Sequence, residues 1–128
     1  MTYCTAVLVQ AGLVIIADTR TNAGLDNVST YRKLHIFQSP GERMLALATA
    51  GNLSVSQSVV SLLTEGTANP ETGEIETIND APTMFRAAQL IGRAIRRVRG
   101  TDGPALDEAE IRFDCSFLFG GQIAGGPM

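Results

Sequence analysis

The sequence predicts an α+β fold in which a layer of two helices covers one face of a sheet. Three observations support this prediction. Apolar, β-branched runs alternate with turn residues up to Gly51. The apolar period then becomes helical in two consecutive segments, and an alternating run returns near the C-terminus. The predicted order is four strands, two helices and one strand. The remaining sheet face would be exposed unless another sheet or another chain covers it.

The N-terminal strands are short apolar runs bounded by turn residues. TAVLV and LVIIADT, separated by QAG, are typical of a hairpin. Residues 20–30 are rich in Gly, Asn, Thr and Ser, so we predict an irregular loop there. YRKLHIF is the third strand. After the turn SPGER, MLALATA is a buried fourth strand that ends at Gly51.

Both helices are predicted from apolar residues at helical spacing. The first starts after Asn52 and is stopped by Gly66. Residues 67–82 are polar and turn-rich. The second helix starts near Thr83 and is predicted to end at Gly100.

The C-terminal part is predicted as a polar linker over 101–110 and a strand over 111–123. A strand that returns after a helix pair normally has further partners. We therefore expect a single domain over residues 1–128 that is truncated at its C-terminus.

Composition disfavours several classes of protein. The formal net charge of -3 and the pI near 5.0 argue against nucleic acid or an anionic membrane as the main partner. The apolar runs are far shorter than the roughly 20 residues of a membrane-spanning helix, and a cytoplasmic location is expected. Cys4 and Cys115 lie on apolar segments and are predicted to be buried, reduced thiols.

The familiar catalytic and binding motifs are absent from the sequence. His35 is the single histidine, which argues against Ser-His or Cys-His catalysis and against a His-rich metal site, and it is predicted to face solvent or a polar contact. There is no P-loop, GxGxxG or CxxC motif, and DGPALDEAE lacks EF-hand spacing. No metal or other cofactor is expected.

One set of residues solves a different chemical problem. A threonine hydroxyl needs a base, and the α-amino group of the chain, with a pKa of roughly 7.7 to 8.0, can be that base. Removal of Met1 would place Thr2 at the N-terminus. A buried Lys33, held by Asp18, would lower the proton affinity of the Thr2 hydroxyl and amine.

Two further residues complete this hypothesis. Arg20 shares a strand face with Asp18 and could extend the charge network. The Gly51 N–H, at the mouth of a helix, could bind the oxyanion of a tetrahedral intermediate. Each residue also has an ordinary interpretation: a capping Asp, a solvated Lys or a turn Gly.

Together these residues resemble the proteasome β-type subunits of the N-terminal nucleophile hydrolase superfamily. The resemblance rests on Thr2, ADTR, YRKLHIF and ATAGN, and it is strongest to the bacterial ancestral-β-subunit (Anbu) branch through MTYC, TRTNAG, NVSTYRK and TAGNL. Counted from Thr2, Lys33 is one position short of the family spacing, which a single loop deletion would explain.

The resemblance implies a four-layer αββα sandwich of which this chain covers roughly the N-terminal half. It implies a threonine peptidase acting on peptides or unfolded protein, in a ring or helical homo-oligomer. A substrate pocket would be lined by Thr21, Tyr31, Thr49 and Leu53 and would favour a small to medium apolar side chain. The family's supporting Ser and Asp residues come from the other half and have no matching positions here.

Two alternatives stay open. The first is an assembly or scaffold subunit that keeps the fold without useful activity. The second is a nucleic-acid stripe formed by Arg86, Arg93 and Arg97 on one helix face. A basic stripe that is solvated, or that meets an acidic segment of a neighbouring subunit, is favoured over nucleic-acid binding because the total charge is negative.

Overall fold

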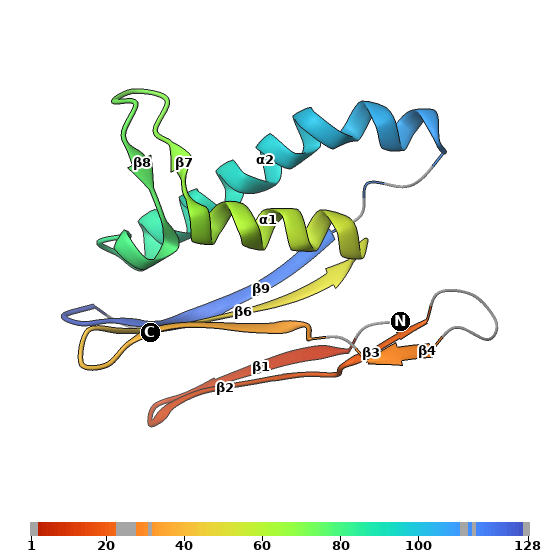
Figure 1. Ribbon diagram of the computed structural model, residues 1–128. Helices are drawn as coiled ribbons and strands as arrows, with labels where there is room; N and C mark the ends of the chain where they lie inside the picture. The colour runs from red at the N-terminus through yellow and green to blue at the C-terminus, as the bar shows by residue number, and fades with distance from the viewer. Residues whose placement is uncertain (1–2, 23–27, 31, 111–112, 114, 127–128) are drawn as a thin grey trace.

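A computed structural model describes residues 3–22, 28–30, 32–110, 113 and 115–126 (Figure 1). Its elements follow the predicted order, with two small hairpins added. They are β1 (Cys4–Val9), β2 (Gly12–Ala17), β3 (Arg20–Asn22), β4 (Val28–Thr30), β5 (Leu34–Ser39), β6 (Arg43–Gly51), α1 (Leu53–Glu65), β7 (Thr67–Ala68), β8 (Ile75–Glu76), a 3₁₀ turn (Ile78–Asp80), α2 (Met84–Glu108) and β9 (Cys115–Ile123).

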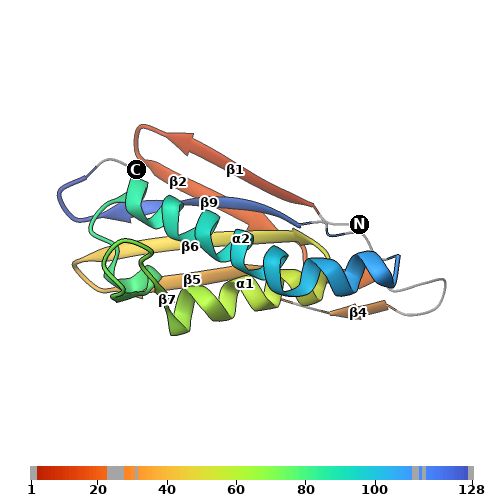
Figure 2. The same cartoon turned by 90° about the horizontal axis from the view of Figure 1, so that it is seen from above.

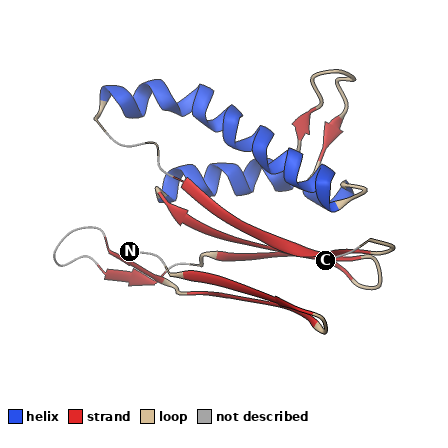
Figure 3. Cartoon of the chain, turned by 180° about the vertical axis from the view of Figure 1, so that it is seen from behind, coloured by secondary structure: helices blue, strands red, loops and turns tan. Residues whose placement is uncertain are grey.

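The elements form three layers. β5, β6 and β9 make an antiparallel sheet in the order β5-β6-β9, and α1 and α2 lie across one of its faces (Figures 1 and 2). The antiparallel hairpin β1–β2 lies on the opposite side (Figure 3). A Cβ at Gly120 would stand 2.6 Å from Leu13 Cδ2, so the missing side chain lets the hairpin approach β9 closely. A second sheet therefore lies over part of the other face, where Ile36 and Met44 stay 46% and 48% exposed. Another sheet is one of the two covers that the sequence left open.

The hydrophobic core lies between the helices and the three-stranded sheet. Leu45 and Leu47 alternate along β6 and are fully buried against Val55 and Val59 of α1. The helix α2 adds the buried side chains of Ala87, Leu90, Ile91, Ala94 and Val98. Three of the four predicted layers are thus present in the described residues, and a second helical layer is not among them.

The predicted starts of both helices are confirmed by their caps. The Asn52 side chain accepts a hydrogen bond from the Val55 N–H at 3.3 Å, and the Thr83 hydroxyl accepts one from the Arg86 N–H at 3.1 Å. Gly66, with a φ of 108°, ends α1 as predicted because this dihedral favours glycine.

The predicted end of the second helix at Gly100 is wrong. The helix α2 continues through Pro104 to Glu108, because Gly100 and Gly103 both take helical dihedrals and Gly103 is buried. Two segments predicted as irregular also contain strands. The pair β3–β4 lies within 20–30, and β7–β8 lies within 67–82.

Candidate active site

The site is built around Asp18, the residue that follows β2. Cys4 pairs with Ala17 in the hairpin, so Tyr3 and Asp18 are the next pair along the two strands. The Asp18 N–H donates to the Tyr3 carbonyl at 3.0 Å. The Tyr3 N–H donates to Asp18 Oδ2 at 2.9 Å. One carboxylate oxygen therefore holds the main chain at the start of β1.

Lys33 occupies the other oxygen of this carboxylate. Its Nζ donates to Asp18 Oδ1 in an ion pair, and its side chain is only 6% exposed, compared with 36% for Asp18. A buried ammonium needs a counter-charge, because its desolvation is costly. The predicted Asp18–Lys33 pair is therefore present, and it joins the end of β2 to the residue preceding β5.

The main chain of Lys33 is fixed by Thr49 of β6. The Thr49 N–H donates to the Lys33 carbonyl at 2.8 Å, which continues the β5–β6 ladder by one residue. The Thr49 hydroxyl points to the same carbonyl at 3.4 Å, and the side chain is buried. The Cys4 Sγ lies 4.0 Å from the Thr49 carbonyl oxygen. Three chain segments therefore converge on this cluster.

The electrostatics of the cluster follow from these contacts. The hydrogen bond from Lys33 lowers the pKa of Asp18 below its usual value, and the Tyr3 N–H adds to this effect against the opposing cost of burial. Burial raises the pKa of the Cys4 thiol, and the Asp18 charge raises it further, while Lys33 opposes both. At neutral pH the cluster therefore holds a carboxylate, and Cys4 keeps its proton.

The other predicted site residues stand at different places. Gly51, exposed and with a φ of 101°, ends β6 two residues after Thr49, and Leu53 is the first residue of α1. Arg20 and Thr21 lie on β3, where only the backbone is described. Thr2 and Tyr31 lie outside the described residues.

Sequence reasoning missed the parts that Tyr3 and Cys4 play in this cluster. Cys4 was interpreted only as a buried thiol, and it is half-buried beside the Asp18–Lys33 pair. The hairpin register was the signal for both, since pairing across QAG brings the residues near Cys4 next to Asp18. His35 lies on β5 and is half-buried, so the prediction of an exposed or polar position is correct only in part.

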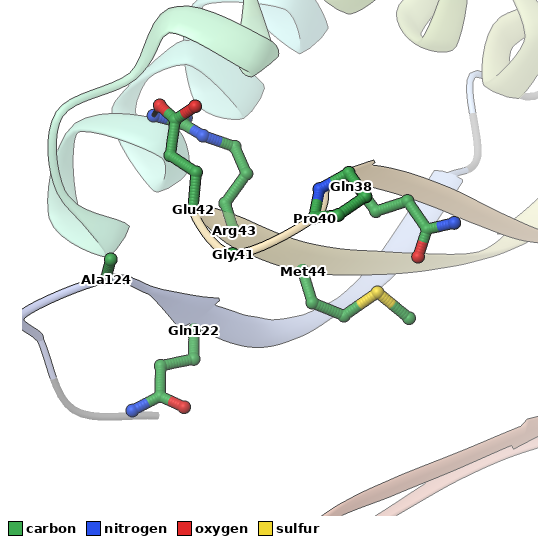
Figure 4. Close-up of a pocket in the computed structure, with 8 residues that line it drawn as sticks. All are labelled: Gln38, Pro40, Gly41, Glu42, Arg43, Met44, Gln122 and Ala124. Atoms are coloured by element: carbon green, nitrogen blue, oxygen red, sulfur yellow. Dashed lines mark hydrogen bonds and ion pairs between the residues drawn. The ribbon is translucent and has the colours of Figure 1, made fainter.

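A pocket of about 350 Å³ lies away from this cluster (Figure 4). It surrounds the turn between β5 and β6 and is lined partly by Gly41, Arg43 and Gln122. Its nearest lining residue along β5, Gln38, is five positions after Lys33, about 17 Å of extended chain. The buried Arg43 guanidinium donates to the carbonyls of Ile78 at 3.3 Å and Ala81 at 2.7 Å, so its role there is to hold the 3₁₀ turn.

Within the described ranges, no group of three or more His, Cys, Asp or Glu side chains could hold a metal ion. None of the helices in this part of the chain is long and apolar enough to cross a membrane.

Comparison with known proteins gives a consistent result. No protein-family model and no curated protein matches the chain. Among known structures, an Anbu (Gly-1) mutant from Hyphomicrobium sp. strain MC1 is 44% identical with a TM-score of 0.79. The Anbu complex from Pseudomonas aeruginosa, described as a helical assembly, is 40% identical with a TM-score of 0.83. Anbu (ancestral beta-subunit) from Yersinia bercovieri is 42% identical with a TM-score of 0.79.

These matches cover 98%, 99% and 98% of this chain but only 49%, 50% and 49% of the three relatives. The chain therefore spans about half of their length. Over this half, the chain matches the bacterial Anbu (ancestral β-subunit) branch of the proteasome-like N-terminal nucleophile hydrolases.

Proposed function

We propose that this chain carries the nucleophile and the charge network of a threonine hydrolase that cleaves peptide bonds. One observation supports this proposal above the others. Asp18 binds the buried Lys33 with one carboxylate oxygen and the Tyr3 N–H with the other. That N–H belongs to the peptide bond between Thr2 and Tyr3, so the same carboxylate binds both the cation and the peptide group next to the proposed nucleophile.

Lys33 is the charge that this chemistry requires near Thr2. A positive charge close to a hydroxyl and an amine stabilises their deprotonated forms. An ammonium that is 6% exposed acts through a low-dielectric surrounding, where its field is stronger than in water. Asp18 binds the Lys33 ammonium, and the N–H and hydroxyl of Thr49 donate to the Lys33 carbonyl, so both the side chain and the main chain of Lys33 are held in place.

The proposed reaction starts once Met1 has been removed. The α-amine of Thr2 takes the hydroxyl proton as Oγ attacks the substrate carbonyl, and the Gly51 N–H donates to the resulting oxyanion. Collapse breaks the C–N bond, and the protonated amine gives its proton to the leaving nitrogen. Water then loses a proton to the same amine, attacks the ester, and releases the carboxylic acid and the Thr2 hydroxyl.

Substrate recognition is proposed to use Thr21, Tyr31, Thr49 and Leu53 for a small to medium apolar side chain. Thr49 precedes Gly51 by two positions and Leu53 follows it by two, so both would flank a substrate bound at the Gly51 N–H. Arg20, next to Thr21 on β3, would extend the charge network of Asp18. The substrate would be a peptide or an unfolded chain in an extended conformation.

A second candidate is an assembly subunit without useful activity. The relative from Pseudomonas aeruginosa is described as a helical assembly, which favours self-association of this chain into a homo-oligomer. Self-association and hydrolysis are compatible. The assembly role is the alternative if Thr2 proves unreactive.

Labelling with a peptide epoxyketone tests the proposal, because this reagent closes a ring with both the hydroxyl and the free α-amine of an N-terminal threonine. Intact and N-terminal peptide masses would be recorded. We expect an adduct on a chain that lacks Met1. The adduct should be absent in Thr2→Ala and much slower to form in Lys33→Ala and Asp18→Asn.

Two matched variants serve as controls. Thr5→Ala removes a threonine from β1, and Arg32→Ala removes the exposed cation next to Lys33. Both should react at the parent rate, since neither residue contacts the Asp18 carboxylate. A retained Met1, or a free Thr2 that never reacts, would overturn the hydrolase proposal and favour the assembly subunit.

A further inference from the structure

The charges of α2 are separated along the helix. From Met84 to Gly100 the helix contains arginines and no acidic residue, and from Asp102 onward to Glu110 the chain contains acidic residues and no basic one. We name the first group, Arg86, Arg93, Arg96, Arg97 and Arg99, the basic stretch. We name the second group, Asp102, Asp107, Glu108 and Glu110, the acidic arm.

This distribution opposes the helix macrodipole. The N-terminal end of a helix favours negative side chains and the C-terminal end favours positive ones. The helix α2 has no acidic residue in its first turn and no basic residue in its last turn, and it has Arg86 and Glu108 there instead. The charges thus do not stabilise the isolated helix, so their arrangement calls for another explanation.

Most of these side chains are exposed and lack an ion-pair partner among the described residues. Arg93 is the exception, because it binds Glu76 at 2.9 Å. Arg86 donates to Gln89, and Arg99 lies over the Phe113 ring at 5.6 Å. Arg96 and Arg97 are exposed, as are Asp107 and Glu108, and none of these four forms an ion pair in the described structure.

The basic stretch borders a pocket of about 520 Å³ between α2 and the turn that joins β7 to β8. Phe85, Arg86, Arg93 and Arg96 line it, together with Glu71 of the turn. Phe85 is 71% exposed. An exposed aromatic ring among arginines is the side-chain composition that protein interfaces favour.

The acidic arm of the same molecule cannot reach this pocket. Phe85 and Asp107 are 22 positions apart in one helix, which places them roughly 33 Å from each other. Toward its C-terminal end α2 also diverges from α1 and the sheet (Figures 1 and 3). Leu106 still packs against the core, but Asp107 and Glu108 are exposed and too far from this pocket to reach it in their own molecule, whereas a second copy can bring them to it.

We infer that α2 is a contact surface between copies of this chain, in which the acidic arm of one copy binds the basic stretch and the Phe85 pocket of another. Charge complementarity identifies the occupant, since each copy presents both halves of the contact. The inference is independent of the proposed hydrolysis, which uses residues of β1, β2, β5 and β6.

A charge-swap experiment on the full chain tests this inference. One variant carries Asp107→Lys and Glu108→Lys, and the other carries Arg96→Glu and Arg97→Glu. Each should self-associate on the order of tenfold more weakly than the parent at low salt, as measured by sedimentation velocity. An equimolar mixture of the two variants should associate like the parent, because the lysines in the arm of one variant can then bind the glutamates in the stretch of the other. Added salt should weaken the parent contact.

The matched control is Ser61→Lys, Thr64→Lys and Glu65→Lys, which changes the net charge equally on the exposed face of α1. It should associate like the parent, and circular dichroism checks the fold of each variant. A monomeric parent, a mixture no better than its components, or equal weakening by the α1 control would overturn the inference. Loss of nucleic-acid binding in the arginine variant without recovery in the mixture would also overturn it, in favour of a nucleic-acid surface.

Discussion

Two ionisable residues near the start of β5 are accommodated in different ways. The Lys33 side chain is buried and forms an ion pair with the Asp18 carboxylate. His35, two positions later, is half-buried. It lies on the same face of the sheet as Phe37, which packs against the core. Burial lowers the pKa of His35, and the positive charge of Arg32 lowers it further. The folded protein therefore favours the neutral imidazole.

Because of this preference, we predict that the free energy of unfolding depends on pH and that His35→Gln removes this dependence. The pKa of His35 is lower in the folded protein than its unfolded value of about 6.5, so the unfolded chain binds more protons between the two values. The contribution of His35 is present above about pH 6.5 and is lost as the pH falls through the folded pKa. Urea unfolding of the parent protein and of His35→Gln between about pH 5 and 8 measures this contribution.

His35 is the single histidine, so few other groups titrate in this range. Arg32→Gln is the control, because removing the nearby charge should narrow the gap between the folded and unfolded pKa and reduce the pH dependence. An unchanged pH dependence in His35→Gln would show that another group is responsible.

The site was partly predictable at the residue scale. Asp18 and Lys33 could be paired from chemistry alone, because a buried cation requires a nearby anion and both flank apolar strands. The contact between Cys4 and Thr49 joins two layers, and no local pattern reports how two layers stack. The hydroxyl of Thr49, predicted to line a substrate pocket, also points to the Lys33 carbonyl, which depends on the β5–β6 register.

At the scale of elements, the sequence predicted the helix ends that are capped by local side chains. It missed the short strands and the true end of α2, which depend on contacts with other parts of the fold. Asn52 and Thr83 act as caps through their own side chains, so the sequence identifies them. Gly100 was predicted to stop the helix, yet α2 continues to Glu108, because the penalty of about 1 kcal/mol for one glycine is too small to end a helix by itself. The short strands β7 and β8 carry too few residues for a period to be recognised.

Gly121 is the position where close contact between strands makes glycine necessary. Its φ is 147°, and a Cβ there would stand 2.1 Å from the Met44 carbonyl oxygen and 2.8 Å from Leu45 Cα. Both obstacles are backbone atoms of the neighbouring strand β6. We expect Gly121→Ala to lower the free energy of unfolding by about 3 kcal/mol, measured by urea titration.

Gly41→Ala is the matched control for this prediction. Gly41 also has a positive φ, 79°, but nothing lies within 4 Å of the added Cβ. Only the backbone strain remains, so the cost should be about 1 kcal/mol. Equal costs at the two positions would mean that β6 and β9 separate easily and that the contact at Gly121 is not restrictive.

At the scale of the whole molecule, the outer face of the β1–β2 hairpin differs from the rest of the surface. Val7, Val14 and Ile16 alternate with inward-facing residues, and each is more than half exposed. Val7 pairs directly with Val14, so the three form one continuous patch. The resemblance predicted a second helical layer, and a layer of that kind would require an apolar face such as this one.

In the chain as described, this face meets solvent and should bind a hydrophobic dye. We expect Val7→Thr, Val14→Thr and Ile16→Thr together to reduce 1-anilinonaphthalene-8-sulfonate fluorescence several-fold without lowering the melting temperature. Threonine keeps the β-branched shape that strands favour, and no buried contact is lost. Ile75→Thr, an exposed position on β8, is the control and should leave dye binding unchanged. If the triple variant instead lost stability, the face would already be covered, by a second copy of the chain or by a different arrangement of the hairpin.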